Sequence, residues 1–159
     1  MKALVQRVTA ASVLVNNEVI STIGKGLCVF IGISREDTLE DIRYIVRKIL
    51  NVKFFDDEKD KKWSNSVMDK QYEILCVSQF TLYHVLKGNK IDFHKAMAGE
   101  KANLLFSHIV DELRAKYKPE FVKDGLFGAM MQVKIENDGP VTIEIETPKK
   151  DTSNNAESI

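Results

Sequence analysis

One glycine–proline step within strand-like sequence constrains this chain more than any other feature. Residues 130–136 and 141–146 show the alternation typical of strands, and Asn137-Asp138-Gly139-Pro140 separates them. Pro140 fixes its own φ and has no N–H, while Gly139 lacks a Cβ and can adopt conformations that other residues before proline cannot. We therefore predict two strands that form an antiparallel pair around this turn, with the carbonyl groups of the turn forming part of a pocket wall.

A second motif, Ser78-Gln79-Phe80-Thr81, follows the apolar run 74–77, which is typical of a buried strand. Its hydroxyl groups can cap the backbone at the end of that strand, or they can take part in chemistry. A hydroxyl nucleophile needs a base within hydrogen-bond reach and a group that orients the base. A catalytic triad is not supported, because no carboxylate except Asp92 is placed to orient any of the three histidines, His84, His94 and His108.

Composition limits the class of protein. A chain of 159 residues is long enough for one domain with a core, and its 23 basic and 23 acidic residues give a formal net charge of +0. Nucleic acid must then be bound by a local patch, because a global positive field is absent. Cys28 and Cys76 lie in apolar runs, which predicts buried, reduced thiols and a cytoplasmic protein.

Several classes of protein and site are not expected. No apolar stretch approaches the roughly 18 residues of a membrane span, and the N-terminus does not resemble a signal peptide. No cluster of Cys, His and Asp has metal-ligand spacing, and no phosphate-binding glycine loop is present. We expect neither a metal nor an organic cofactor.

The first half of the chain is predicted to contain strands and one helix. Residues 4–15 and the segment that follows Asn16-Asn17 form a hairpin, and the continuous apolar run 26–33 is typical of a central strand buried on both faces. A helix begins after Asp37 or Thr38 and buries the face formed by Leu39, Ile42, Ile45, Val46, Ile49 and Leu50.

The second half is predicted to contain one more helix between irregular segments. Residues 56–62 form a solvated loop, 86–95 an irregular basic stretch where we expect substrate contacts, and 125–128 a corner that leads into the next strand. The helix buries the face formed by Ala102, Leu105, Phe106, Ile109 and Leu113. Together these elements predict an α+β fold with one compact domain, residues 1–147, and a disordered tail, residues 148–159.

Five motifs in order carry a family resemblance. They are Lys2-Ala3-Leu4-Val5-Gln6-Arg7-Val8, Ser78-Gln79-Phe80-Thr81-Leu82, Lys87-Gly88-Asn89-Lys90, Phe127-Gly128-Ala129 with Met131, and Asn137-Asp138-Gly139-Pro140-Val141-Thr142. Over residues 1–147 the chain resembles the D-aminoacyl-tRNA deacylases. The resemblance implies a mostly antiparallel, barrel-like sheet with two main helices packed on it. It also implies a homodimer with active sites at the interface, which hydrolyses the ester that links a D-amino acid or glycine to the 3′-terminal ribose of tRNA.

The resemblance also implies roles for individual residues. Gly139 and Pro140 would form a Gly-cisPro gate, inserted into the partner's pocket, whose carbonyls bind the α-ammonium of a D-aminoacyl group and exclude an L side chain. Arg7 would brace that segment. The backbone of Ser78, Gln79, Phe80 and Thr81 would orient the ester and stabilise the oxyanion while the vicinal 2′-hydroxyl assists, and Thr81 as a covalent nucleophile is the less favoured alternative.

Two further groups of residues would contact the nucleic acid. Phe127, Gly128 and Met131 would hold the terminal adenosine, and Lys87, Lys90 and Lys95 would contact tRNA phosphates. The family usually has proline where this chain has Ile91, which leaves the rigidity of the basic segment open. The alternatives are plainer. Gly139-Pro140 is then an ordinary trans turn, Phe127 is a core residue, and Arg7 and the lysines face solvent. The alternative function is that of a non-catalytic nucleic-acid or aminoacyl-RNA binding module.

Overall fold

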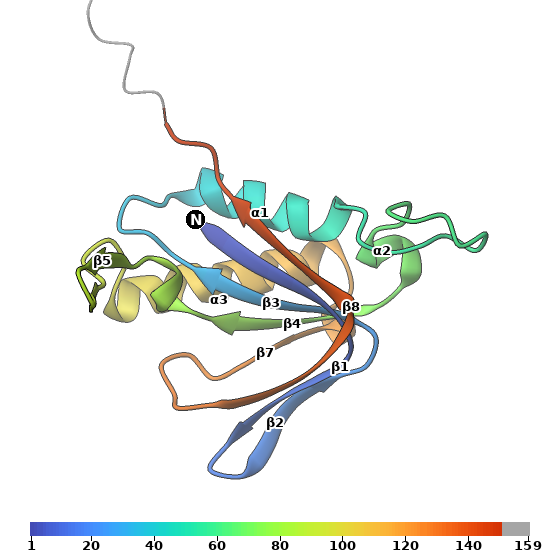
Figure 1. Cartoon of the computed structure of the whole chain (residues 1–159), viewed down its shortest axis with the longest axis horizontal. Coiled ribbons are helices and arrows are strands. Elements are labelled where there is room, and N and C mark those ends of the chain that lie inside the picture. The colour runs from blue at the N-terminus through green and yellow to red at the C-terminus, as the bar shows by residue number, and fades with distance from the viewer. Residues whose placement is uncertain (151–159) are drawn as a thin grey trace, which may run out of the picture.

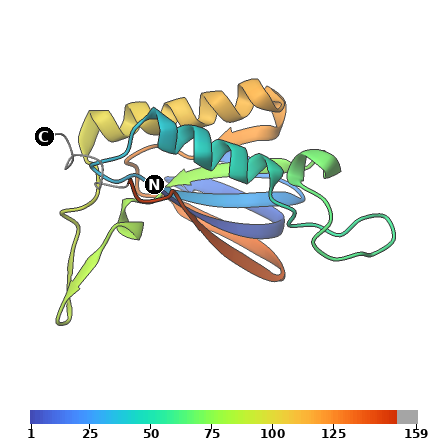
Figure 2. The same ribbon diagram turned by 90° about the horizontal axis from the view of Figure 1, so that it is seen from above.

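The computed structural model describes residues 1–150, and residues 151–159 of the predicted tail lie outside the described part. One six-stranded sheet forms the centre of the molecule, and the two long helices lie on one face of it (Figures 1 and 2). The opposite face curls around a second apolar cluster that includes Val13, Cys28 and Leu75. This arrangement confirms the predicted α+β class.

The sheet is built around the first strand. β1 (Lys2–Val15) pairs antiparallel with β2 (Glu18–Ile23), β3 (Gly26–Gly32) and β8 (Gln132–Glu146). The remaining pairings are parallel, between β3 and β4 (Glu73–Ser78) and between β4 and β7 (Val122–Asp124). Ser21 Oγ of β2 donates a hydrogen bond to the Asp124 carbonyl of β7 at 2.5 Å, which joins the two ends of the strand order into a nearly closed barrel.

The predicted hairpin and central strand are confirmed. Asn16 and Asn17 form the β1–β2 turn with φ of 49° and 64°, a left-handed conformation that asparagine tolerates. β3 lies between β1 and β4, and alternate residues face the helices and the barrel interior, so the whole run is apolar. Cys28 and Cys76 are buried free thiols, as predicted.

Both predicted helices are present, with one error on the first. α1 (Leu39–Asn51) begins after Thr38, and its buried face contains Ile42, Ile45, Val46, Ile49 and Leu50. Leu39 was predicted on that face but is 51% exposed; it is the first residue of the helix, so no preceding helical turn covers it. α3 (Gly99–Lys116) buries Ala102, Phe106, Ile109, Val110 and Leu113, while Leu105 is only partly buried.

Several short elements were not predicted, among them α2 (Val67–Lys70), the 3₁₀ turn η2 (Pro119–Phe121), and β7, which has only three residues. α2 is stabilised by a capping box, in which the Ser66 hydroxyl accepts the Asp69 N–H at 3.1 Å and the Asp69 carboxylate accepts the Ser66 N–H at 2.8 Å. Elements this short carry no periodic pattern that a sequence can reveal. None of the helices in residues 1–150 has both the length and the apolar character needed to cross a membrane.

The predicted pair of strands around Gly139-Pro140 is wrong. Residues 132–146 form one strand, β8, and both of its halves pair with β1. The register shifts between the pairs Val8–Asn137 and Gln6–Thr142, so the four residues 138–141 stand opposite a single residue of β1, Arg7. β1 is long enough to supply hydrogen-bond partners along all of β8, and the special backbone residues therefore form a bulge instead of a hairpin turn.

The basic segment is more regular than predicted. β5 (Val85–Lys87) and β6 (Lys90–Asp92) form an antiparallel hairpin that projects from the body of the molecule (Figure 2). Ile91 pairs with Leu86 in this hairpin, and residues 93–95 alone remain irregular. Ladder pairing was not apparent from the sequence because each strand has only three residues.

Candidate functional site

The parallel strands bring two predicted parts of the site to one edge of the sheet. β3, β4 and β7 run in the same direction, so their carboxyl ends meet. The Ser78–Thr81 motif follows β4, and the corner with Phe127, Gly128 and Met131 follows β7. The Gly125 N–H donates to the Cys76 carbonyl at 2.9 Å, which fixes the start of the corner beside β4.

The Ser78–Thr81 motif leaves β4 as a tight turn. Gln79 N–H still pairs with the Ile31 carbonyl of β3 at 2.8 Å, and the 3₁₀ helix η1 (Phe80–Leu82) begins at the next residue. η1 is held closely against β3, since a Cβ at Gly32 would lie only 2.8 Å from Leu82 Cβ. The motif is therefore positioned by two buried strands.

The hydroxyl of Thr81 is not activated by a base. Gln79 Nε2 donates to Thr81 Oγ1 at 2.5 Å, while His84 Nδ1 lies 2.8 Å from the Thr81 carbonyl and not from its hydroxyl. Among residues 1–150, neither a histidine nor a carboxylate is hydrogen-bonded to this hydroxyl. The geometry gives Thr81 a positioning contact and does not give it a nucleophile's environment.

The backbone N–H groups at the start of η1 are available donors. Phe80 and Thr81 stand in the first turn, where helical N–H groups lack an intrahelical acceptor, and neither has another acceptor within the described chain. Phe80 is 55% exposed, and its ring and that of Phe93 are arranged edge to face with their centroids 5.0 Å apart. Two adjacent N–H donors beside an exposed aromatic ring suit an oxyanion next to an organic group.

The corner after β7 combines packing and exposure. Phe127 is half-buried, and the centroid of its ring lies 5.8 Å from that of the Phe106 ring of α3. Gly128 has a φ of 74°, with open space where a Cβ would lie, and Met131 packs against the barrel interior. Phe127 thus belongs partly to the core, as its plainer alternative predicts, and is still partly exposed.

The Gly139–Pro140 segment is held by Arg7. Its peptide bond is cis. Arg7 Nε donates to the Asp138 carbonyl at 3.2 Å and lies 3.3 Å from Asp138 Oδ2, and Arg7 Nη1 donates to the Phe54 carbonyl at 2.8 Å. Arg7 is therefore not a free solvent-facing position. The Phe54 contact was missed by sequence reasoning, because a backbone carbonyl leaves no mark on residue type.

One chain does not bring the two motifs together. In the ladder, Arg7 is paired with Leu27, which is paired with Ile74, and Ser78 lies four residues farther along β4. Along the strand direction, four residues correspond to roughly 13 Å. Across the sheet, β1 and β3 lie between β8 and β4, so three strand spacings of about 4.8 Å separate β8 from β4. The bulge of β8 and the end of β4 accordingly lie at different ends of the sheet (Figure 1).

The predicted phosphate-contacting lysines differ in their surroundings. Lys87 Nζ is 2.9 Å from Asp92 Oδ2, and His94 Nδ1 contacts the other oxygen of that carboxylate. The hydrogen bond from Lys87, followed by those from His94, holds the pKa of Asp92 well below its usual range. Lys90 and Lys95 are exposed. No group of three or more His, Cys, Asp or Glu side chains in residues 1–150 is placed to hold a metal ion.

Comparisons with known proteins identify a family and related structures. The family model described as D-Tyr-tRNA(Tyr) deacylase matches residues 4–146. The D-aminoacyl-tRNA deacylase 1 of Bos taurus is 63% identical over 148 residues, which cover 93% of this chain and 71% of that protein. A solved structure described as c-Myc DNA Unwinding Element Binding Protein is 62% identical, with a TM-score of 0.91 and coverage of 94% of this chain and 100% of that one. A structure described as a probable eukaryotic D-amino acid tRNA deacylase, 23% identical, shows the same fold with a TM-score of 0.77 over 91% of this chain and 98% of that one.

Proposed function

The chain belongs to the D-Tyr-tRNA(Tyr) deacylase family and is a hydrolase of that class, and we propose that it removes D-amino acids and glycine from tRNA by a chirality gate shared between two subunits. The observation that carries the proposal is the common edge of the sheet. Along this edge, the unbonded N–H groups of Phe80 and Thr81 follow β4, and the Phe127–Met131 corner follows the neighbouring strand β7. The two N–H donors can bind an oxyanion, and the corner can bind a terminal adenosine.

The proposed chemistry depends on the substrate as much as on the protein. An aminoacyl ester is already activated, and the adjacent 2′-hydroxyl of the terminal ribose can assist its own hydrolysis. The protein then has to orient the ester and stabilise negative charge on the carbonyl oxygen, which the backbone of Ser78, Gln79, Phe80 and Thr81 supplies. The Gln79–Thr81 hydrogen bond supports this role by holding the motif in one conformation.

The gate is proposed to act between subunits. Gly139 and Pro140 are exposed on the bulge of β8, and the bulge lies away from the Ser78–Thr81 motif of its own chain. A second copy that inserts its bulge beside Phe80 would complete the pocket in a homodimer. Fixed carbonyls around the α-carbon would then bind the α-ammonium of a D-aminoacyl group and leave no space for an L side chain, while glycine would enter because it has none.

The remaining roles follow from the same arrangement. Lys87, Lys90 and Lys95 are proposed to contact tRNA phosphates, with Lys87 partly neutralised by Asp92. We place the protein in the cytoplasm, where both tRNA and reduced thiols are found. Burial supports reduced thiols, because it raises the pKa of Cys28 to about 12 and that of Cys76 further.

The test is a stereochemical comparison. D-Tyr-tRNA, L-Tyr-tRNA and Gly-tRNA are incubated with the protein, and release of the amino acid is followed together with the oligomeric state by sedimentation. We expect rapid loss of the D-Tyr and glycyl esters, a stable L-Tyr ester and a dimer. Equal hydrolysis of both tyrosyl esters, or of neither, would exclude the gate, and full activity of a monomer would exclude the shared pocket.

Thr81→Ala is expected to retain most of the activity. The substitution removes one hydrogen bond to Gln79, which corresponds to a loss of less than about tenfold. Removing a covalent nucleophile costs on the order of a millionfold in a hydrolase that depends on one. Single-turnover deacylation of D-Tyr-tRNA by the variant separates the two cases, and abolished activity with an unchanged melting curve would restore Thr81 as the nucleophile.

A second function is supported by one observation. The solved structure that is 62% identical to this chain is described as a DNA unwinding element binding protein, which matches the alternative of a nucleic-acid binding module. The net charge of +0 disfavours general polyanion binding by this chain. Retention of tRNA or DNA at physiological salt with no release of D-tyrosine would favour the binding module over the deacylase.

A further inference from the structure

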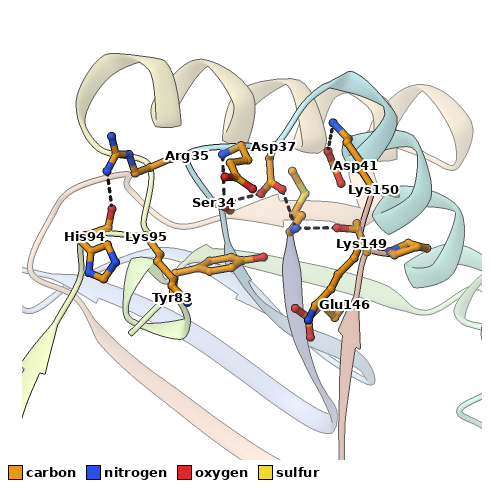
Figure 3. Close-up of a pocket in the computed structure, with 14 residues that line it drawn as sticks. Ser34, Arg35, Asp37, Asp41, Tyr83, His94, Lys95, Glu146, Lys149 and Lys150 are labelled. Atoms are coloured by element: carbon orange, nitrogen blue, oxygen red, sulfur yellow. Dashed lines mark hydrogen bonds and ion pairs between the residues drawn. The ribbon is translucent and has the colours of Figure 1, made fainter. Parts of the chain in front are cut away.

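Two clefts share a wall on the side of the molecule that contains the β3–α1 turn. The larger, of about 1110 Å³, lies among Ser34, Arg35, Tyr83, His94 and the segment after β8 (Figure 3). The smaller, of about 580 Å³, is lined by Arg35, Phe93, His94, Ala96, Met97, Ala98 and Lys101. Arg35 and His94 belong to both, so the two clefts adjoin.

The charges of these clefts are distributed unevenly. The smaller cleft has two cationic side chains and a histidine and no carboxylate in its lining. In the larger cleft, one side has the basic residues Arg35 and Lys95 and the histidine His94 (Figure 3). The other side has both signs of charge, from Asp37, Asp41, Glu146, Lys149 and Lys150. Glu36 is the acidic lining residue next to Arg35 in sequence. In a protein with zero net charge, a cleft without any carboxylate is a local anion-attracting site.

Arg35 is held in place with donors to spare. Its Nη1 donates to the His94 carbonyl at 3.1 Å, and the Arg35 N–H donates to the Lys95 carbonyl at 3.0 Å. A guanidinium has five N–H donors, and one side-chain hydrogen bond leaves the others for a ligand. A planar, partly fixed guanidinium is well suited to the paired oxygens of a phosphate.

The smaller cleft adjoins the proposed ester site. Phe93 forms part of its wall, and the centroids of the Phe93 ring and the Phe80 ring of η1 are 5.0 Å apart. The Phe80 backbone is also a proposed oxyanion donor. A polyanion whose 3′ end lies at η1 would therefore reach the cleft within a short distance.

We propose that Arg35 and Lys101, with Lys95 of the adjoining larger cleft, bind the phosphodiester backbone of the tRNA strand that leads away from the terminal adenosine. This inference rests on the proposed deacylase function and adds a path for the acceptor strand that differs from the Lys87–Lys90 hairpin. The path uses phosphate contacts, so it contributes affinity and orientation and carries no preference for sequence.

The experiment compares a long and a short substrate. Arg35→Gln, Lys101→Gln and the double variant are assayed on D-Tyr-tRNA and on the D-tyrosyl ester of adenosine, which has no phosphodiester. For each single variant we expect kcat/KM on D-Tyr-tRNA to fall about tenfold, because KM rises while kcat stays the same. We expect kcat/KM on the adenosine ester to stay unchanged. The slope of log affinity for uncharged tRNA against log salt should decrease in magnitude by about 1 per contact removed.

Matched controls lie away from the cleft. Lys116→Gln alters an exposed lysine at the other end of α3, and Arg43→Gln alters an exposed arginine on α1. Both should leave the two substrates and the salt slope unchanged. If the control variants weaken tRNA binding as much as Arg35→Gln, the effect is one of total charge and the cleft proposal is wrong.

The remaining outcomes separate this proposal from the deacylase function. Unchanged tRNA binding and kinetics in the double variant would exclude the phosphate path while the deacylase stands. Equal losses on tRNA and on the adenosine ester would also exclude it, because the residues would then act on the ester site. A wild-type protein without deacylase activity would refute the proposed function, and the tRNA-binding slope would still decide whether the cleft binds phosphates.

Discussion

Gly139→Ala is expected to lower the rate of D-Tyr-tRNA deacylation by about two orders of magnitude, the cost of displacing a positioning group by about 1 Å. Gly139 has a φ of 120°, which residues with a Cβ rarely adopt. An added Cβ would lie 3.0 Å from Val141 Cγ2 and 3.2 Å from Arg7 Nη2. Arg7 is only 16% exposed and is hydrogen-bonded to the Phe54 carbonyl, so it cannot move away freely. The bulge itself must then shift.

Gly139 and Pro140 are exposed and are not among the core residues, so the fold should survive this substitution. We expect a small change in Tm and a large change in rate, measured by thermal unfolding and by single-turnover deacylation. Asn17→Ala is the matched control, because Asn17 also has a left-handed φ, 64°, in a turn outside the candidate site. Asn17→Ala should lower the Tm and leave the rate of D-Tyr-tRNA deacylation unchanged. A Gly139→Ala variant with wild-type activity would mean that the bulge takes no part in the site.

Gly26→Ala is expected to prevent folding or to cost more than about 3 kcal/mol, at the upper end of overpacking effects. Gly26 is the first residue of β3 and pairs with Glu73 at the start of β4. A Cβ at this position would lie 1.8 Å from the Glu73 carbonyl oxygen, 2.7 Å from its carbon and 2.9 Å from its nitrogen. Backbone atoms in a parallel ladder cannot rotate away as a side chain can, so the strands must separate.

Gly24→Ala is a control two residues away. A Cβ at Gly24 would meet only the end of the Glu73 side chain, Oε1, at 3.6 Å, which is an ordinary contact. Urea denaturation of both variants gives the comparison, with a loss of less than about 1 kcal/mol expected for Gly24→Ala. Equal stability of the two variants would show that β3 and β4 do not approach as closely as described.

Long elements with one consistent pattern could be predicted from the sequence. The spacing of Ile42, Ile45, Val46 and Ile49 is helical over about two turns, and α1 buries those residues. The apolar run of β3 and the Asn16-Asn17 turn depend on neighbours in the sequence, so the strand was located and the hairpin was given its correct partner strand. The short strands β5, β6 and β7 have three residues each, too few to establish a period.

The candidate site residues were singled out in the sequence, but their positions relative to one another within one chain were not predicted. The motifs identified Ser78–Thr81, the Phe127 corner and Gly139–Pro140, and the structure joins the first two at one edge and separates the third. Arg35 and Lys101 were not singled out, because an isolated cation in sequence is indistinguishable from ordinary surface charge. Only the fold shows that they line one cleft without a carboxylate.

The sequence by itself determined the periodic helices, the buried central strand, the two reduced thiols and the positions where backbone chemistry is special. These features depend on interactions over a few residues, or on residue type alone. The tertiary structure decided that residues 132–146 are one strand along β1 and that Gly139–Pro140 is a bulge held by Arg7. The physical reason is that strand pairing is chosen by which distant segments together satisfy backbone hydrogen bonds and bury apolar surface, and no local window of sequence contains that comparison.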